Sequence, residues 1–135
     1  MTRTIACIAG VLLSGGMLPA QDSVSARGKY LVEEVAKCAD CHTPKTAKGA
    51  PDRSKWLKGG TMDVKPVGTI AGWNAAAPDL TSTSPLWSRW SMEGMVKYFE
   101  TGRNPMGNVS NPPMPAYRLR HDDAAAIAAY LKSLK

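Results

Sequence analysis

The sequence predicts an all-α fold in which three to five helices are joined by long loops. Apolar side chains recur at helical spacing in three separate stretches, at residues 26–38, 91–101 and 122–134. The segments between them are irregular and rich in glycine and proline, which is unusual in a small domain. Such loops make sense when they surround a large apolar ligand that replaces part of the packed core. The 135 residues suffice for one domain.

The first predicted helix begins near Ala26 and runs into Cys38. Its apolar residues gather on one side at helical spacing. Glu33 and Lys37 are four positions apart, in the order that favours an ion pair along a helix. We therefore expect this helix to deliver Cys38 and the residues that follow it at its C-terminal end.

Irregular structure is expected after this helix. Thr43 precedes a proline, which biases its backbone away from helical geometry. Residues 45–54 are polar and contain a glycine and a proline, so they predict a loop. Residues 62–69 predict a short extended segment.

Two further helices follow. In the first, Ser91 is a suitable N-cap, Glu93 suits the first turn, and Gly102 is placed to end the helix. Residues 103–115 hold four prolines and predict a second irregular segment. The last helix, at residues 122–134, has aspartates at its positive end and lysines near its negative end, which the helix dipole favours.

The run from Cys38 to His42 carries the strongest chemical signal. Two cysteines separated by two residues, with a histidine directly after the second, form the attachment sequence of a c-type haem. Each thiol adds to one vinyl group at the porphyrin edge, and the next imidazole then lies where it can ligate the iron. The sequence therefore predicts one covalent haem c, attached at Cys38 and Cys41, with His42 as its proximal ligand.

Two other interpretations fit this run less well. A thioredoxin-type redox pair belongs to a βαβ pattern, and the sequence shows no such alternation. A zinc ion needs four ligands around a tetrahedron. Cys41 and His42 are neighbours that could not easily both reach one ion, and the other histidine of the chain is His121.

The second axial position decides whether such an iron only carries electrons or also binds small molecules. Met114 is favoured there, because prolines on both sides stiffen its loop and can hold a thioether at a fixed distance from the iron. Met106 and His121 are the alternatives. Met92 and Met95 lie in a helical stretch and are expected to pack in the core.

Residues 1–20 have the layout of a secretory signal peptide. One positive charge precedes a short apolar run at residues 5–13, and a small residue, Ala20, ends the segment. The apolar run is too short to span a bilayer. We therefore expect cleavage near Ala20, a mature domain at residues 21–135 and a periplasmic location, since haem attachment in bacteria takes place outside the cytoplasm. An uncleaved membrane anchor is the alternative.

The formal net charge of +6 favours solubility and steers the protein towards acidic surfaces. The lysines and arginines are scattered and form no single stripe, so nucleic-acid binding is not expected.

Together these features make the sequence similar to the class I c-type cytochromes over nearly all of residues 21–135. The resemblance implies the small cytochrome c fold, wrapped around one covalently bound haem. Five stretches carry it, namely the first helix, the haem motif, a proline turn, the Pro-Met-Pro loop and the last helix, at residues 27–31, 38–42, 77–81, 113–115 and 129–134.

The resemblance also implies two contacts. In that family the first and last helices cross near perpendicularly with a glycine at the contact, and Gly28 and Tyr130 match this crossing. A proline carbonyl of the family accepts a hydrogen bond from the proximal histidine, and Pro78 matches that proline. Here Asp79 follows it, where the family has asparagine.

Two residues are expected near the carboxylates of the ring. The indole N–H of Trp73 and the guanidinium of Arg103 could each donate a hydrogen bond to a haem propionate.

The function that the resemblance implies is single-electron transfer in the periplasm, by a carrier that is not itself an enzyme. A periplasmic dehydrogenase is the expected donor, and an oxidase or another cytochrome is the expected acceptor. The sequence is also similar to cytochrome subunits of bacterial periplasmic dehydrogenases, so a subunit of such a complex is one alternative. A gas-binding or peroxidase-type haem protein with a displaceable sixth ligand is the other.

Overall fold

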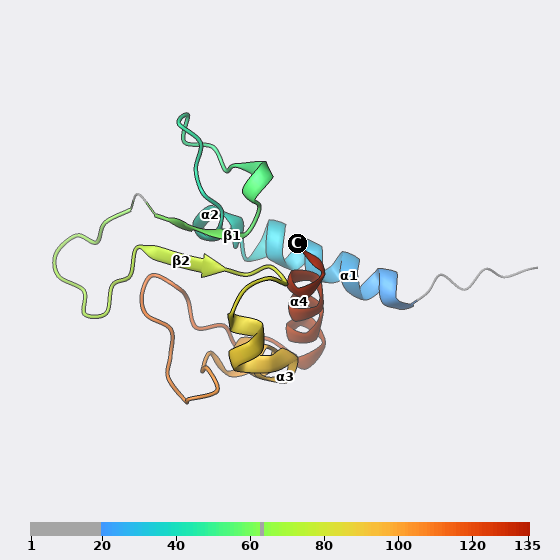
Figure 1. The fold of residues 1–135 in the computed structure, drawn as a ribbon. Coiled ribbons are helices and arrows are strands. Elements are labelled where there is room, and N and C mark those ends of the chain that lie inside the picture. Colours follow the sequence, from blue (N-terminus) through green and yellow to red (C-terminus); the bar gives the residue numbers. More distant parts are fainter. Residues whose placement is uncertain (1–19, 63) are drawn as a thin grey trace, which may run out of the picture.

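The structure is a computed structural model that describes residues 20–62 and 64–135 (Figure 1). The predicted signal peptide lies outside the described residues, apart from Ala20. The fold is mostly helical with a small two-stranded sheet, which confirms the predicted class. In chain order the elements are α1 (Ala20–Tyr30), the π-helical turn η1 (Leu31–Val35), α2 (Ala39–His42), the 3-10 turn η2 (Arg53–Lys55), β1 (Lys58–Thr61), β2 (Ala76–Asp79), α3 (Leu86–Thr101) and α4 (His121–Ser133).

Helices α1 and α4 cross in close contact (Figure 1). Gly28 permits the crossing, because a Cβ at this position would lie 2.0 Å from the carbonyl oxygen of Ala126 and 2.8 Å from the Cβ of Tyr130. The small side chains of Ala124 and Ala128 are fully buried in α4. The expected match of Gly28 and Tyr130 to a helix crossing is confirmed.

The first helix changes its winding before it reaches the cysteines. After η1, Lys37 adopts a left-handed backbone with a φ of 50°, and the chain starts again as α2. The expectation of one helix running into Cys38 is therefore wrong. The expected ion pair is also wrong, because Lys37 pairs with Glu34 at 2.9 Å, whereas Glu33 accepts a hydrogen bond from the Tyr130 hydroxyl on α4. Glu33 lies in the π-helical turn η1, and this winding directs its side chain towards α4.

The sheet lies between α2 and α3 in the sequence. Its strands pair antiparallel, with Lys58 opposite Asp79 and Gly60 opposite Ala77. The extended segment predicted at residues 62–69 is wrong in position, because β1 ends before it and β2 begins after it. Strand β1 reads Lys-Gly-Gly-Thr, which has no apolar alternation for a sequence pattern to detect.

Helix α3 begins at Leu86, earlier than expected, and is interrupted at Ser91, where φ is 61° and ψ is 175°. The Ser91 hydroxyl accepts a hydrogen bond from the backbone N–H of Gly94 at 3.3 Å. Gly102 ends the helix in a left-handed conformation, and its N–H donates to the carbonyl oxygen of Tyr98. Both capping predictions are confirmed, but Ser91 caps the second half of a longer helix.

The core forms around α4, which contacts α1, η1 and α3. Val32, Phe99, Ile127 and Leu131 are among its buried side chains. Leu57, directly before β1, is fully buried as well and anchors the sheet to this core. Within the described part of the chain, no helix has the length and apolarity needed to cross a membrane.

Replacing Gly28 with alanine is expected to lower the free energy of unfolding by at least about 2 kcal/mol, because the added methyl group must push α1 away from Ala126. Denaturant unfolding followed by circular dichroism measures the change. Lys29→Ala on the exposed side of the same helix is the control and should change stability by less than about 0.5 kcal/mol. Equal unfolding midpoints for the two variants would contradict the close crossing.

Candidate functional site

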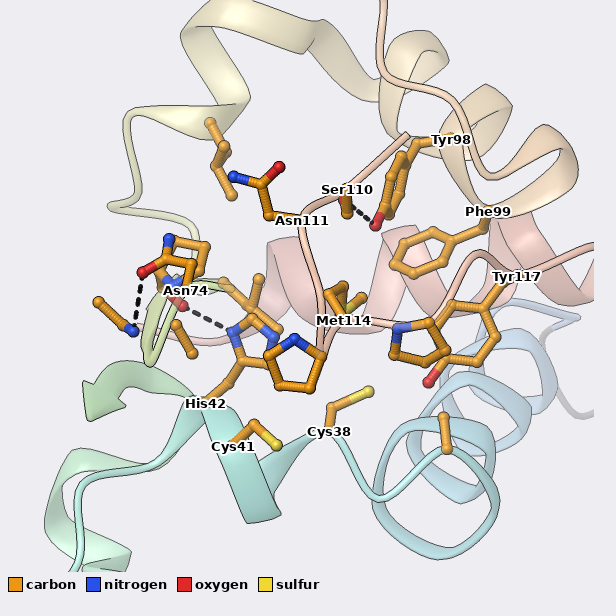
Figure 2. A pocket seen from close by; sticks show the side chains of 18 of the residues that line it. Cys38, Cys41, His42, Asn74, Tyr98, Phe99, Ser110, Asn111, Met114 and Tyr117 are labelled. Carbon is orange, nitrogen blue, oxygen red and sulfur yellow. Dashed lines mark hydrogen bonds between the residues drawn. The ribbon is translucent and has the colours of Figure 1, made fainter. Parts of the chain in front are cut away.

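A cavity of about 300 Å³ lies beside α2, and most of the side chains around it are apolar (Figure 2). Among the described residues that line it there is no aspartate or glutamate, and Lys37 is the one lysine. The lining residues are Ala36, Lys37, Cys38, Cys41, His42, Met62, Asn74, Ala76, Ala77, Pro78, Leu80, Leu86, Trp90, Met95, Tyr98, Phe99, Ser110, Asn111, Pro113, Met114, Pro115 and Tyr117.

Helix α2 and its N-cap residue, Cys38, place both cysteines and the histidine on one wall of this cavity (Figure 2). The backbone N–H of His42 donates to the carbonyl oxygen of Cys38 at 2.9 Å, which closes a single helical turn. Cys38 is buried, Cys41 is half-buried, and both thiols are free. Burial raises the pKa of the Cys38 thiol to about 11. Two unpaired sulfurs therefore face one large apolar space.

His42 is held by one hydrogen bond from its ring. Its Nδ1 lies 2.8 Å from the carbonyl oxygen of Pro78, and a carbonyl can only accept, so Nδ1 carries the proton. The lone pair for a metal is then on Nε2. Burial lowers the pKa of His42, with the bond to Pro78 opposing this effect, so the ring is neutral at neutral pH. A neutral, oriented imidazole is the form that ligates a metal.

The carbonyl of Pro78 is itself fixed by the sheet and by the turn after it. Pro78 belongs to β2, and the N–H of Leu80 donates to the carbonyl oxygen of Leu57 at 2.9 Å. The carboxylate of Asp79 accepts a hydrogen bond from the N–H of Thr81 at 2.6 Å. Aspartate thus makes this turn with its own side-chain oxygen, at the position where the resembled family has asparagine.

Three methionines line the cavity, and Met114 is one of them. It is directed into the same space as His42 (Figure 2). Met62 and Met95 also line the cavity, and Met95 is 2% exposed. Met106 is 73% exposed and is not among the lining residues.

His121 lies outside the cavity lining as well. Its Nδ1 pairs with Glu100 at 2.7 Å, at the start of α4. The fold therefore brings together the two cysteines, His42 and Met114, and it keeps the alternative ligands Met106 and His121 away.

Comparison with known proteins agrees with this geometry. The sequence profile of the cytochrome c family matches residues 25–135. The chain belongs to the cytochrome c family.

The relatives of this cytochrome c are longer proteins, and the chain matches a part of each. It is 32% identical over 126 residues to a diheme cytochrome c-type protein of Cereibacter sphaeroides, covering 90% of this chain and 38% of the relative. It is 33% identical over 115 residues to a fructose dehydrogenase cytochrome subunit of Gluconobacter japonicus, covering 80% of this chain and 21% of the relative. It is 34% identical over 125 residues to the cytochrome c subunit of a quinone alcohol dehydrogenase of Gluconobacter oxydans, covering 84% of this chain and 24% of the relative. The chain thus spans less than half of each of these relatives.

Membership of the family implies a covalent haem c, and the cavity of this cytochrome c suits that group. The two thiols stand at the ends of one helical turn, the Nε2 of His42 is free of the Pro78 hydrogen bond, and the remaining wall is mainly apolar. A planar apolar ring with an iron centre needs these three features. The donor set is sulfur and imidazole, and among the described residues no group of three or more His, Cys, Asp or Glu side chains is gathered for a metal ion.

Trp73 and Arg103 do not line the cavity. Trp73 is half-buried, and Arg103 donates from Nη1 to the carbonyl oxygen of Gly107 at 2.7 Å. The polar side chains that do line it include Asn74 and Asn111, which sequence reasoning missed. Both lie in irregular segments where no periodicity marks an inward face. The role of Trp73 and Arg103 towards a propionate stays a prediction.

Thr43 supports the site from behind, and sequence reasoning missed it too. It follows His42, is 1% exposed, and its hydroxyl oxygen accepts a hydrogen bond from the backbone N–H of Leu57 at 3.0 Å. This bond fixes the segment after the haem motif against the start of β1.

Thr43→Val keeps the shape of the side chain but leaves the buried Leu57 N–H without its acceptor. We expect a loss of about 1–3 kcal/mol in unfolding free energy, measured by denaturant titration. Thr61→Val, at an exposed position in β1, is the matched control and should be nearly neutral. If both variants unfold at the wild-type midpoint, the buried hydrogen bond contributes nothing.

Proposed function

We propose that this cytochrome c carries single electrons in the periplasm, with one haem c joined to Cys38 and Cys41 and ligated by His42 and Met114. The observation that supports it is the convergence of these four side chains on one apolar cavity. When bound, the haem supplies a one-electron change between ferric and ferrous iron. The protein itself acts as a carrier and not as an enzyme.

The chain's own residues hold and tune this centre. The hydrogen bond from His42 to Pro78 fixes the plane of the imidazole and raises its basicity. A neutral thioether and an apolar wall favour the less charged, ferrous state, so the reduction potential is relatively high. Prolines 112, 113 and 115 stiffen the segment around Met114, which keeps the site similar in both oxidation states.

The location rests on the N-terminal segment. Residues 1–20 are a signal peptide that is removed near Ala20, and residues 21–135 are the exported domain.

The donor is a periplasmic dehydrogenase, and the acceptor is an oxidase or another cytochrome. Relatives named as cytochrome subunits of fructose, gluconate and alcohol dehydrogenases support a dehydrogenase as the donor. The second candidate function is that of a cytochrome subunit within a dehydrogenase complex. The same relatives favour it, because each is named as such a subunit.

The surface charge supports an acidic partner. The basic residues are less evenly scattered than expected, because residues 45–58 contain five basic residues and one acidic residue, a net charge of +4 out of +6 for the whole chain. Lys55 and Lys58 are exposed, and the segment begins three residues after His42. Charge of one sign beside the electron-transfer site accelerates encounter with partners of the opposite sign.

The first test is the mature protein from a bacterial host that attaches haem. Its mass should exceed that of residues 21–135 by one haem. The oxidised form should show the weak far-red band of methionine bound to iron, and the reduced form should bind carbon monoxide slowly. A mass equal to the polypeptide alone would refute the proposal, and rapid carbon monoxide binding would favour the gas-binding alternative.

Met114→Ala should abolish the far-red band and make the reduced protein bind carbon monoxide rapidly, because the sixth position is then open. Absorption spectroscopy and flash photolysis measure the two effects. Met106→Ala is the matched control and should leave both unchanged, since Met106 is 73% exposed and outside the cavity lining. Loss of the band in Met62→Ala or Met95→Ala, with Met114→Ala unaffected, would assign the ligand elsewhere.

Neutralising Lys55 and Lys58 together with glutamine should slow oxidation of the ferrous protein by ferricyanide about two- to fivefold at low ionic strength, since this anion is drawn to the basic segment. Stopped-flow kinetics over a salt series measures the effect, which should vanish at high salt. The control is the double variant in which Lys29 and Lys135 are replaced with glutamine, which removes the same amount of charge outside residues 45–58. The same slowing in both pairs would show that net charge alone, and not this segment, steers the reaction.

A further inference from the structure

The Pro78 carbonyl that accepts the His42 hydrogen bond lies near the C-terminal end of β2. The Met62 N–H donates to the Ala75 carbonyl oxygen at 2.8 Å, so the alternate residues 75, 77 and 79 are the ones that bond towards β1. The carbonyl of Pro78 therefore points to the opposite edge of the strand. Its direction depends on the strand and also on how the chain is held directly after it.

The turn that follows β2, at residues 80–84, is tied to α3 by a buried side-chain bond. The indole N–H of Trp87 donates to the carbonyl oxygen of Thr81 at 2.7 Å, and both residues are buried. The backbone N–H of Thr81 in turn donates to the carboxylate of Asp79, the residue after Pro78. Two hydrogen bonds therefore lead from the Trp87 ring to the neighbour of the carbonyl that holds His42.

Trp87 is a rigid donor. Its side chain is 7% exposed and belongs to the hydrophobic core. The ammonium group of Lys132, in the last turn of α4, lies 4.9 Å from the centre of its ring. Because packing holds the ring in place, the bond from its Nε1 fixes the position of Thr81 and not the reverse.

The other bonds of this turn to neighbouring elements are made through the backbone. The N–H of Leu80 donates to the Leu57 carbonyl oxygen, and the N–H of Ser82 donates to the Leu134 carbonyl oxygen, each at 2.9 Å. Within the described part of the chain, Trp87 supplies the one side-chain donor that reaches residues 79–84 from outside them. A single substitution can therefore remove this bond and leave the backbone bonds in place.

We propose that Trp87 is a positioning residue for His42, and that its indole N–H, through Thr81, keeps the Pro78 carbonyl in line with the Nδ1–H of the ring. Without this bond, the turn after β2 moves more freely, and the bond between His42 and Pro78 opens more often. The imidazole is then held less firmly and is a weaker donor from Nε2, because a second-shell acceptor raises ligand basicity. This inference rests on the proposed ligation by His42.

Trp56 provides a matched control. It is partly buried against the same core, and the guanidinium of Arg53 lies 4.1 Å from the centre of its ring. Its indole lies beside the Tyr130 hydroxyl on α4, and not at the turn after β2. Replacing either tryptophan with benzothienylalanine, in which sulfur takes the place of the N–H group, keeps the shape of the ring. Only the replacement of Trp87 removes the bond to Thr81.

The test uses the full, haem-loaded protein in its diamagnetic ferrous form, with isotope-labelled histidine. Nuclear magnetic resonance measures how fast the Nδ1 proton of His42 exchanges with solvent. Benzothienylalanine at position 87 should make this exchange about two- to tenfold faster, the range that one net hydrogen bond supplies. Trp87→Phe should change it in the same direction, and the replacement of Trp56 should leave it at the wild-type rate.

Two further measurements separate positioning from a loss of stability. The backbone N–H of Leu131, which is fully buried in α4, reports global unfolding and should exchange at the wild-type rate in the benzothienylalanine variant at position 87. The reduction potential of that variant should rise, because a less basic imidazole stabilises the ferric state less. The control replacement of Trp56 should leave the potential unchanged.

Two results would overturn the proposal, and they differ in what else they refute. If the His42 ring protons show the large shifts of an axial ligand, but Nδ1 exchange is equal in the Trp87 and Trp56 variants, Trp87 does not position the ring and the proposed ligation stands. Equal acceleration at His42 and at the Leu131 amide would lead to the same conclusion. If the wild type lacks the shifted ring protons, ligation by His42 and the positioning role are both refuted.

Discussion

The hydrogen bond from the His42 ring to the carbonyl oxygen of Pro78 is the contact on which the rest of the site depends. It fixes which nitrogen of a buried, neutral imidazole faces the cavity, and it can do so only because β2 holds that carbonyl still. The small sheet therefore serves the site more than the core. Thr43 and Leu57 act in the same direction: the Leu57 N–H bonds to Thr43 and its carbonyl oxygen bonds to Leu80, which ties the chain around His42 to the chain around Pro78. The bond from the Thr81 N–H to Asp79 closes the turn after Pro78.

The two sides of the cavity are built on different principles. The side that carries the cysteines and His42 is a single helical turn, and short bonds tie it to the sheet: the His42 ring donates to the Pro78 carbonyl oxygen, and the Leu57 N–H donates to the Thr43 hydroxyl. The side that carries Met114 is a proline-rich segment with few backbone donors, placed against α3 by the bond between the Tyr98 and Ser110 hydroxyls and by packing of Tyr117 on Phe99. A covalently attached group needs strict placement on its attachment side, whereas an exchangeable ligand depends on how firmly its loop is tied. The structure thus separates attachment from ligand control.

Much of the architecture could be predicted, and the errors have identifiable causes. The helical periodicity and the end charges of residues 122–134 found α4 to within a residue, because an amphipathic helix carries its signal locally. The first helix was expected to continue into Cys38, but packing against α4 selects a π turn and a left-handed Lys37. Strand β1 was missed because two glycines and two polar residues carry no pattern, and it exists through its pairing with β2.

The sequence by itself determined the chemistry of this protein. The order of Cys38, Cys41 and His42, and the prolines beside Met114, are local features that need no tertiary contact to be recognised. The tertiary structure decided which polar groups share the cavity, since Asn74, Tyr98, Ser110 and Asn111 come from irregular segments or from a helix face that no periodicity marks as a site. Local spacing fixes which atoms can form bonds. The side chains that surround those atoms are set by long-range packing, which a linear pattern does not encode.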